Sequence, residues 1–495
     1  MDETIPDATE FNEFLKLFNS TEIQDIVKGT SGLRKLLLYE RCTPDQVLGA
    51  TVLPRLVAFL ESSSPEDLLY ETCWMMSIFA FLQYIKEIVG TGLLVPLVKL
   101  LSLDTTSDRV RDKITFCLGN VTKQSLQCRQ QLLELGIMKY LIEIVENTSD
   151  QQLLRNSAWL VALLGRGPYP PLQMTIGSVG ILHKFLENSD PEIQLEGIRG
   201  ISYIAARPEG IQSVIDSGSV KRVVEIMNHS ETSTFVALTM IASMGMGQPS
   251  QSDYMIDLGG LKIILELLDN PSSRIKAHAF VGIGNFLANP SQIQKAIDLG
   301  FFSKFATFGN SATKDFNSLC EIVIIFNNAT LHANEEQIEY FVSIGLIPLM
   351  CKLSGLEIKY ASLDIPNLVL KTFINLFKTG DTLKEKNNGI NPYTQAFKVA
   401  NGLASLRFCV GSSRDPERSR IGSHIITAYF PEILNSNTPP LVNNNTATPS
   451  TTTTPPSTTS TTPSTTSTTS STPPTANTTA NSSADEQNSK GCIIN

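Results

Sequence analysis

The residues whose types could support chemistry are eight cysteines and five histidines. No two cysteines have the Cys-x-x-Cys spacing of a metal or redox site, and no histidine lies in a His-Glu-x-x-His pattern. Phosphate-binding loops, Gly-x-Ser-x-Gly turns and dinucleotide-binding glycine patterns are also absent from the sequence. We therefore expect a protein without enzyme activity, without a metal site and without a cofactor.

One cysteine stands out by its position. Cys492 begins the last four residues, Cys-Ile-Ile-Asn, and a cysteine followed by two aliphatic residues and a terminal residue is the prenylation pattern. The alternative is an unmodified tail with a reactive thiol. The other cysteines are scattered through apolar helical segments, so we expect buried thiols in a reducing compartment.

Residues 274 to 308 show the element that must position any functional side chain. Apolar residues recur three or four apart from Ile275 to Leu287, which predicts one face of a helix, and Asn289-Pro290 then stops that helix. A short second helix follows. It ends at Gly300, a residue suited to the left-handed position that turns the chain into a third helix at Phe301.

The same unit recurs along the chain. Its turn glycines are Gly92, Gly136, Gly180, Gly218, Gly259, Gly300 and Gly345. The intervals between them are 44, 44, 38, 41, 41 and 45 residues, and Thr51 marks a further copy. A period in the low forties built of helices is typical of armadillo and HEAT arrays. We predict an all-α fold, an armadillo-repeat solenoid that follows a right-handed superhelix.

The composition divides the chain into four parts. Residues 1–30 form an acidic N-terminal arm with an apolar stripe from Phe11 to Phe18. Either this stripe packs on the first repeat as a cap, or the arm is mobile. Residues 31–434 form the armadillo-repeat solenoid. Residues 435–489 are almost entirely Thr, Ser, Pro, Asn and Ala, which predicts a disordered tail, and residues 490–495 carry the prenylation-like motif.

Charge and hydropathy limit the partners and the compartment. The net charge of −9 disfavours nucleic-acid binding, which needs a basic face. The acidic start of the chain lacks the pattern of a signal peptide, and no apolar run approaches the ~18 residues of a membrane-spanning helix. We expect a protein of the cytoplasm and nucleus.

Several stretches resemble, in order and spacing, the importin-alpha family of armadillo adaptors, which carry proteins with nuclear localisation signals. They are NSAWLVALLGRGPYPP at 156–171, PEGIQSVIDSGSVKRVVEIM at 208–227, PSQIQKAIDLGFFSKF at 290–305, NEEQIEYFVSIGLIPLMCKL at 334–353 and GINPY at 389–393. The resemblance covers about residues 30 to 430. It implies that cargo proteins with basic localisation peptides are the partners.

In that family, the groove helix of most repeats carries a tryptophan and, four residues later, an asparagine. The tryptophan rings hold lysine side chains through cation–π attraction, and the asparagine amides bind the peptide backbone. A further acidic residue belongs to the family's minor site. The resemblance assigns these peptide-binding roles to Trp74, Asn120, Trp159, Asn285, Glu321 and Asn328.

The sequence also departs from the family's pattern. No repeat keeps both members of the tryptophan–asparagine pair. Ile78 and Leu163 replace the asparagine four residues after Trp74 and Trp159, and Phe116 replaces the tryptophan four residues before Asn120. Two further departures are Gln124, where the family has the acidic partner of the key lysine, and Leu82, where it has glycine. The basic N-terminal segment that recruits importin-beta in the family has no match in residues 1–30, so importin-beta is not carried over as a partner.

Two functions follow from these observations. The first is an importin-alpha-like adaptor that binds nuclear localisation signals of cargo in its concave groove. The alternative is a prenylated, membrane-tethered armadillo scaffold that no longer binds these signals, and Cys492 and the acidic arm favour it. A single prenyl group gives only weak, reversible attachment, so we expect at most a minor membrane-associated fraction.

Overall fold

The structure is a computed structural model. It describes residues 6–49, 52–61, 63–311, 315–354, 359–360, 363–411 and 415–433. Thr51, the predicted disordered tail and the prenylation-like motif with Cys492 lie outside the described residues. The chain divides into two compact units, unit 1 from Met1 to Phe301 and unit 2 from Phe302 to Asn495, and each is described by itself.

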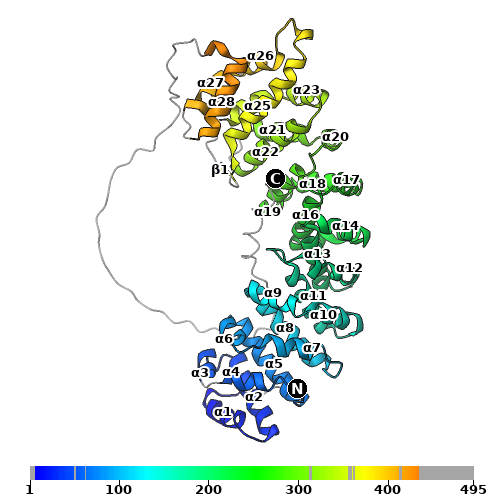
Figure 1. The fold of residues 1–495 in the computed structure, drawn as a ribbon, viewed down its shortest axis with the longest axis vertical. Coiled ribbons are helices and arrows are strands. Elements are labelled where there is room, and N and C mark those ends of the chain that lie inside the picture. Colours follow the sequence, from blue (N-terminus) through cyan, green and yellow to red (C-terminus); the bar gives the residue numbers. More distant parts are fainter. Residues whose placement is uncertain are drawn as a thin grey trace, which may run out of the picture. The chain divides into compact units, whose positions relative to one another are not determined.

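Unit 1 consists of helices that follow one another in sequence order along the array (Figure 1). Its α-helices are α1 (Phe11–Phe18), α2 (Ile23–Leu38), α3 (Pro44–Gly49), α4 (Val52–Ala58), α5 (Glu66–Phe81), α6 (Ile85–Val89), α7 (Leu94–Leu101), α8 (Asp108–Gln124), α9 (Leu126–Glu134), α10 (Ile137–Asn147), α11 (Gln151–Gly165), α12 (Val179–Leu186), α13 (Pro191–Ala205), α14 (Pro208–Asp216), α15 (Ser219–Ile226), α16 (Glu231–Met244), α17 (Pro249–Asp257), α18 (Gly260–Leu267), α19 (Ser273–Gly284) and α20 (Pro290–Asp298). Its 3-10 helices are η1 (Ala8–Glu10), η2 (Leu172–Met174), η3 (Ile176–Ser178) and η4 (Met227–His229).

Unit 2 continues the helical pattern and adds one small pair of strands. Its helices are α21 (Phe301–Asn310), α22 (Phe316–His332), α23 (Glu335–Ser343), α24 (Leu346–Leu353), α25 (Ile365–Thr382), η5 (Glu385–Asn387), α26 (Pro392–Val399), α27 (Gly402–Gly411), α28 (Pro416–Tyr429) and η6 (Pro431–Ile433). Strand β1 (Lys359–Tyr360) pairs antiparallel with β2 (Leu363–Asp364), with Lys359 opposite Asp364. These two strands were not expected from the sequence.

The predicted three-helix unit is confirmed at residues 274 to 308, where α19, α20 and α21 follow one another. Gly300, between α20 and α21, has φ +81°, and the other predicted turn glycines, apart from Gly180, also have positive φ. The prediction was wrong for Gly180, which is the second residue of α12 and does not have positive φ. The two short 3-10 helices that lead into α12 replace the left-handed turn there.

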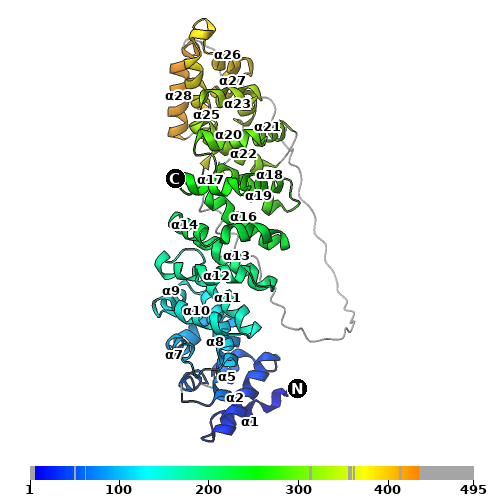
Figure 2. The same cartoon turned by 90° about the vertical axis from the view of Figure 1, so that its right-hand side faces the viewer.

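Within each unit, one long helix from each repeat packs side by side with its counterpart in the next repeat, as the turned view in Figure 2 also shows. We call these the stacked helices. They are α2, α5, α8, α11, α13, α16 and α19 in unit 1, and α22, α25 and α28 in unit 2. Each stacked helix is covered by a neighbour on both flanks within its unit, except at the ends, so an apolar stripe that a lone helix would expose becomes buried. The armadillo-repeat fold is thereby confirmed.

The N-terminal arm packs against the first stacked helix. The side chains of Phe14 and Phe18 on α1 are buried, and the backbones of α1 and α2 approach closely at Gly29. A Cβ atom at Gly29 would lie 2.2 Å from the backbone nitrogen of Phe18. The predicted boundary between residues 30 and 31 falls inside α2, so arm and first repeat share a helix. In the described part of the chain, no helix combines the length and the apolar character that crossing a bilayer needs.

A loop with three prolines, residues 166–171, interrupts the helices between α11 and η2, because proline is not tolerated inside a helix. Two arginines from neighbouring repeats hold it. Arg129 donates to the backbone carbonyls of Arg166 and Pro168, and Arg207 donates to the carbonyl of Pro170 at 2.6 Å. These bonds satisfy carbonyl groups that have no helical partner.

We expect Gly29→Ala to destabilise the contact between α1 and α2, because the new methyl group would clash with backbone atoms that cannot move aside. The cost should be about 1–3 kcal/mol, the usual range for overpacking. Hydrogen-exchange mass spectrometry should show reduced protection of α1 and α2.

Gly180→Ala is the matched control for that substitution. A Cβ atom at Gly180 would meet no atom of another element within 4 Å, and the φ of this residue suits any side chain, so the exchange of α12 should be unchanged or slower. Equal protection of α1 in the Gly29→Ala variant and the wild type would contradict the close packing.

Candidate functional site

Three positions at which the importin-alpha family has tryptophan lie on consecutive stacked helices. Trp74 lies on α5, Phe116 on α8 and Trp159 on α11, and each side chain is half-buried. The intervals of 42 and 43 residues between them match the repeat, so one side chain per repeat faces the same side of the stack. We call this series of positions the aromatic column.

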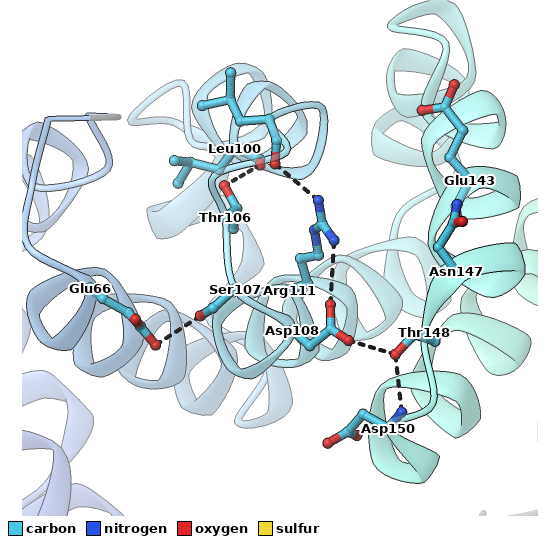
Figure 3. A network of polar contacts seen from close by, with 11 residues as sticks. Glu66, Leu100, Thr106, Ser107, Asp108, Arg111, Glu143, Asn147, Thr148 and Asp150 are labelled. Carbon is cyan, nitrogen blue, oxygen red and sulfur yellow. Dashed lines mark hydrogen bonds and ion pairs between the residues drawn. The ribbon is translucent and has the colours of Figure 1, made fainter.

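Hydrogen bonds between helix starts fix the register of the stacked helices. Ser107, which precedes α8, donates to a carboxylate oxygen of Glu66 on α5 at 2.8 Å. Thr148, just before α11, donates to Asp108 on α8 at 2.7 Å, and Figure 3 shows both bonds in one network. We call these the cap bridges. They hold the start of α8 to that of α5 and the start of α11 to that of α8, so the side chains of the aromatic column keep a fixed spacing.

The Trp74 ring already has a cation against it. The guanidinium carbon of Arg34, on α2, lies 3.6 Å from the centroid of the ring. Arg34 Nε also donates to a carboxylate oxygen of Glu71 at 2.5 Å, and both side chains are largely buried. The ammonium of Lys113, on α8, lies 4.9 Å from the same centroid. The two cations therefore come from the two helices that pack against α5.

Further ion pairs continue this arrangement across the first four stacked helices. The guanidinium carbon of Arg109 lies 3.8 Å from the centroid of the Tyr70 ring, and its Nη1 lies 3.0 Å from a carboxylate oxygen of Asp67. Lys113 bonds to Asp112 at 2.8 Å, and Asn156 on α11 donates to the other oxygen of Asp112 at 2.6 Å. Each of these cations has a carboxylate partner within the chain.

The second tryptophan is packed against protein on the side of α8. A Cβ atom at Gly119 would lie 2.2 Å from Cζ3 of Trp159, so the indole lies across this glycine. The centroids of Phe116 and Trp159 are 6.1 Å apart, with 36° between the ring planes. An aliphatic chain between two rings needs roughly 7–8 Å, because each carbon contact takes about 3.5–4.0 Å. A lysine side chain therefore does not fit between these rings.

The assigned asparagines of unit 1 use their amide donors inside the chain. Asn120 is 5% exposed, and its Nδ2 donates to the carbonyl of Phe116 at 3.0 Å. Asn285 Nδ2 donates to the carbonyl of Ala242, on the preceding stacked helix, at 2.9 Å. Each of these amides thus uses one of its two N–H donors inside the chain.

The remaining two assigned residues lie on α22 of unit 2. Glu321 is buried with 2% exposure, and Asn328 is half-buried. They are seven residues apart, about two helical turns, which places them on one face. The side-chain oxygen of Asn328 accepts a hydrogen bond from Nδ2 of Asn327 at 3.4 Å. The structure thus separates the six assigned residues into four in unit 1 and two in unit 2.

Gln124 and Leu82, which depart from the family's pattern, lie at the ends of two adjacent stacked helices. Nε2 of Gln124 donates to the carbonyl of Ala80 at 2.7 Å, so the amide ties the end of α8 to the end of α5. Leu82 is 40% exposed beside it. An amide that serves as a donor to backbone cannot replace the charge-assisted bond of a carboxylate to lysine.

The sequence analysis missed Arg34 and Lys113. Neither residue could be assigned from its spacing, because Arg34 lies 40 residues before Trp74, whereas the column positions are 42 and 43 residues apart. The approach of both cations to Trp74 depends on how far α2 and α8 are displaced along α5. Among the described residues, no group of three or more histidines, cysteines or carboxylates could hold a metal ion.

Buried thiols are confirmed for most of the cysteines that the structure describes. Cys73, Cys117, Cys128, Cys320 and Cys351 are buried, whereas Cys42 is half-buried. Burial raises the pKa of Cys117 to about 12, so this thiol stays protonated and unreactive at neutral pH.

A second stacked pair of a cation and a ring lies further along unit 1. Arg274, on α19, has its guanidinium carbon 3.7 Å from the Phe235 centroid, and the His278 ring packs 5.0 Å from the same ring. Burial lowers the pKa of His278 to about 4, and the charge of Arg274 acts in the same direction. His278 is therefore neutral in the folded protein at neutral pH.

This histidine predicts a pH dependence of stability. The contribution of His278 to the free energy of unfolding is complete above the ordinary histidine pKa of about 6.5. It is lost as the pH falls toward 4, because only the unfolded chain then binds the proton readily. Between pH 7 and 4.5, the thermal unfolding midpoint of the wild type should therefore fall more steeply than that of His278→Phe. Replacement of the exposed His332 by Phe is the control. Parallel curves for the wild type and His278→Phe would show that the histidine is not buried in its neutral form.

Comparisons with known proteins give relatives over most of the chain, although no protein-family model matches it. Importin subunit alpha-4 of Arabidopsis thaliana is 30% identical over 394 residues, which cover 78% of this chain and 72% of that protein. Importin subunit alpha-1b of Oryza sativa subsp. japonica is 29% identical over 389 residues, covering 77% and 71%. The crystal structure of an engineered protein matches with a TM-score of 0.71 and 20% identity, over 84% of this chain and 98% of that one, and this likeness concerns the fold alone.

Proposed function

Since the chain belongs to the importin-alpha family, we propose that it acts as an adaptor that binds localisation peptides of cargo proteins for import into the nucleus. The observation that carries the proposal is the aromatic column, with one side chain at the matched position of each of the stacked helices α5, α8 and α11. Such a column suits an extended peptide, whose side chains also recur at a fixed spacing. The cytoplasm and the nucleus are the compartments that this function requires.

The geometry also supports weak binding of basic peptides. Trp74 has two cations of the chain beside it, and Phe116 and Trp159 are too close to admit a lysine. Gln124 provides no charge for the key lysine, and each unit 1 asparagine uses one of its two amide N–H donors in a bond to a backbone carbonyl. Each of these features weakens an attraction on which the family's binding mode depends.

We therefore expect a peptide with a single cluster of lysines to bind this chain at least tenfold more weakly than it binds an importin-alpha with intact tryptophan–asparagine pairs. This ratio corresponds to about 1.4 kcal/mol. Isothermal titration calorimetry of both proteins with the same peptide measures it, and the same peptide with its lysines changed to alanine is the control. Equal affinities would show that the lost pairs do not matter.

The proposal does not include importin-beta as a partner. In the family, a basic N-terminal segment recruits it, whereas residues 1–30 carry seven acidic residues and two lysines. Helix α1 of this segment packs against α2 through Phe14 and Phe18. The acidic arm thus supports a role as a cap on the array.

The membrane-tethered scaffold is a second candidate function, and the Cys-Ile-Ile-Asn end and the acidic arm are the two features that favour it. We expect a mostly soluble protein with a minor membrane fraction, because the residues near Cys492 supply neither a polybasic patch nor another cysteine. Cys492→Ser should abolish this fraction in a flotation assay, while Cys42→Ser, at a position within the repeats, should retain it. Mass spectrometry that finds only the unmodified C-terminal peptide in the wild type would eliminate the tether.

A further inference from the structure

We propose that Arg34 is a resident cation that occupies the Trp74 ring in place of a cargo lysine and closes this position of the column to basic peptides. The inference rests on the proposed function, since it concerns which peptides the same face accepts. It makes Arg34 a specificity-determining residue, although it lies on the first stacked helix, outside the repeats that carry tryptophan.

Arg34 contacts the Trp74 ring in the way that a bound lysine would. A lysine recognised by tryptophan places its cation over the ring face, within about 6 Å of the centroid. Arg34 has its guanidinium carbon at 3.6 Å, well inside that limit, and the planar group suits stacking on indole. Its side chain is 1% exposed, so this attraction is not weakened by water as a surface contact would be.

Arg34 also cannot move aside easily. Its Nε bonds to Glu71 at 2.5 Å, and a lysine that displaced it would leave a buried ion pair broken. The neighbouring Leu33 and Leu36 are fully buried, which prevents α2 from rotating. Two residues before Arg34, Gly32 lies against the ring of Phe14, so α1 holds this part of α2 in place.

The charges around Trp74 are already balanced within the chain. The cations around Trp74 and Tyr70 are matched by carboxylates of the same face, and every pair lies within bonding distance. The pairs are Arg34 with Glu71, Arg109 with Asp67, and Lys113 with Asp112. An approaching lysine therefore meets no surplus negative charge at this position, and it meets Arg34 and Lys113 as like charges.

The test uses the full chain and a lysine-rich peptide labelled for fluorescence anisotropy. Arg34→Ala leaves the Trp74 ring and the Glu71 carboxylate around a vacant space, which is the chemistry that a lysine needs. We expect the peptide to bind this variant at least tenfold more tightly than the wild type. The gain should disappear when Trp74→Ala is added, because it depends on the ring.

Arg274→Ala is the matched control, since it removes a stacked arginine from Phe235 in another repeat. It should change the affinity less than twofold. A folded Arg34→Ala variant with unchanged affinity would overturn the inference, as would an equal gain in Arg274→Ala. A gain in the Arg34 variant with no binding by the wild type would retain the inference and reject basic-peptide binding as the natural function.

Two measurements do not depend on the folding of the Arg34 variant. Trp74→Ala in the otherwise natural chain should change peptide affinity less than twofold, and a tenfold loss would show that cargo already uses the ring. In Trp159→Phe, Trp74 is the sole tryptophan. Its quenching by acrylamide should be at least threefold weaker in the folded than in the unfolded chain, and equal quenching would show a ring that Arg34 does not cover.

Discussion

Within each unit, the rest of the structure depends on the packing of each stacked helix against its counterpart in the next repeat. No repeat can bury its apolar stripe alone, so the position of every side chain on the face follows from this contact. The cap bridges, such as that from Ser107 to Glu66, add a directional constraint to a packing force that has no direction of its own. The aromatic column is regular because the helix starts are regular.

On this scaffold, the polar and charged side chains around the aromatic column bond to other groups of the same chain. Groups that would serve a peptide instead serve the chain: Arg34 covers Trp74, and the amides of Asn120 and Asn285 bond to backbone carbonyls. A buried donor or cation that is satisfied internally offers little to a ligand, because the ligand must first break the existing contact. Family membership therefore determines the fold of this protein more closely than it determines what the face binds.

The sequence predicted the parts of the structure that depend on local rules. Gly300 turns the chain because its backbone conformation disfavours other residues, and the helices around it begin and end close to the predicted residues. Gly180 was misjudged because spacing alone assigned it to a turn, and the β1–β2 hairpin has strands too short to show a period. The partners of Trp74 were missed for another reason. Contacts between Arg34, Lys113 and this ring depend on the displacement of helices along one another, which one sequence does not encode locally.

The place of the cap bridges along the helices has an evolutionary consequence. Glu66 and Trp74 are eight residues apart on α5, or about 12 Å along the helix axis, and the same separation divides Asp108 from Phe116 on α8. Mutations in the aromatic column therefore leave the bonds that align the repeats intact. A lineage can lose or exchange its ligands one repeat at a time while the array still folds, and a gene copy released from its original cargo can drift toward new ones without passing through an unfolded ancestor.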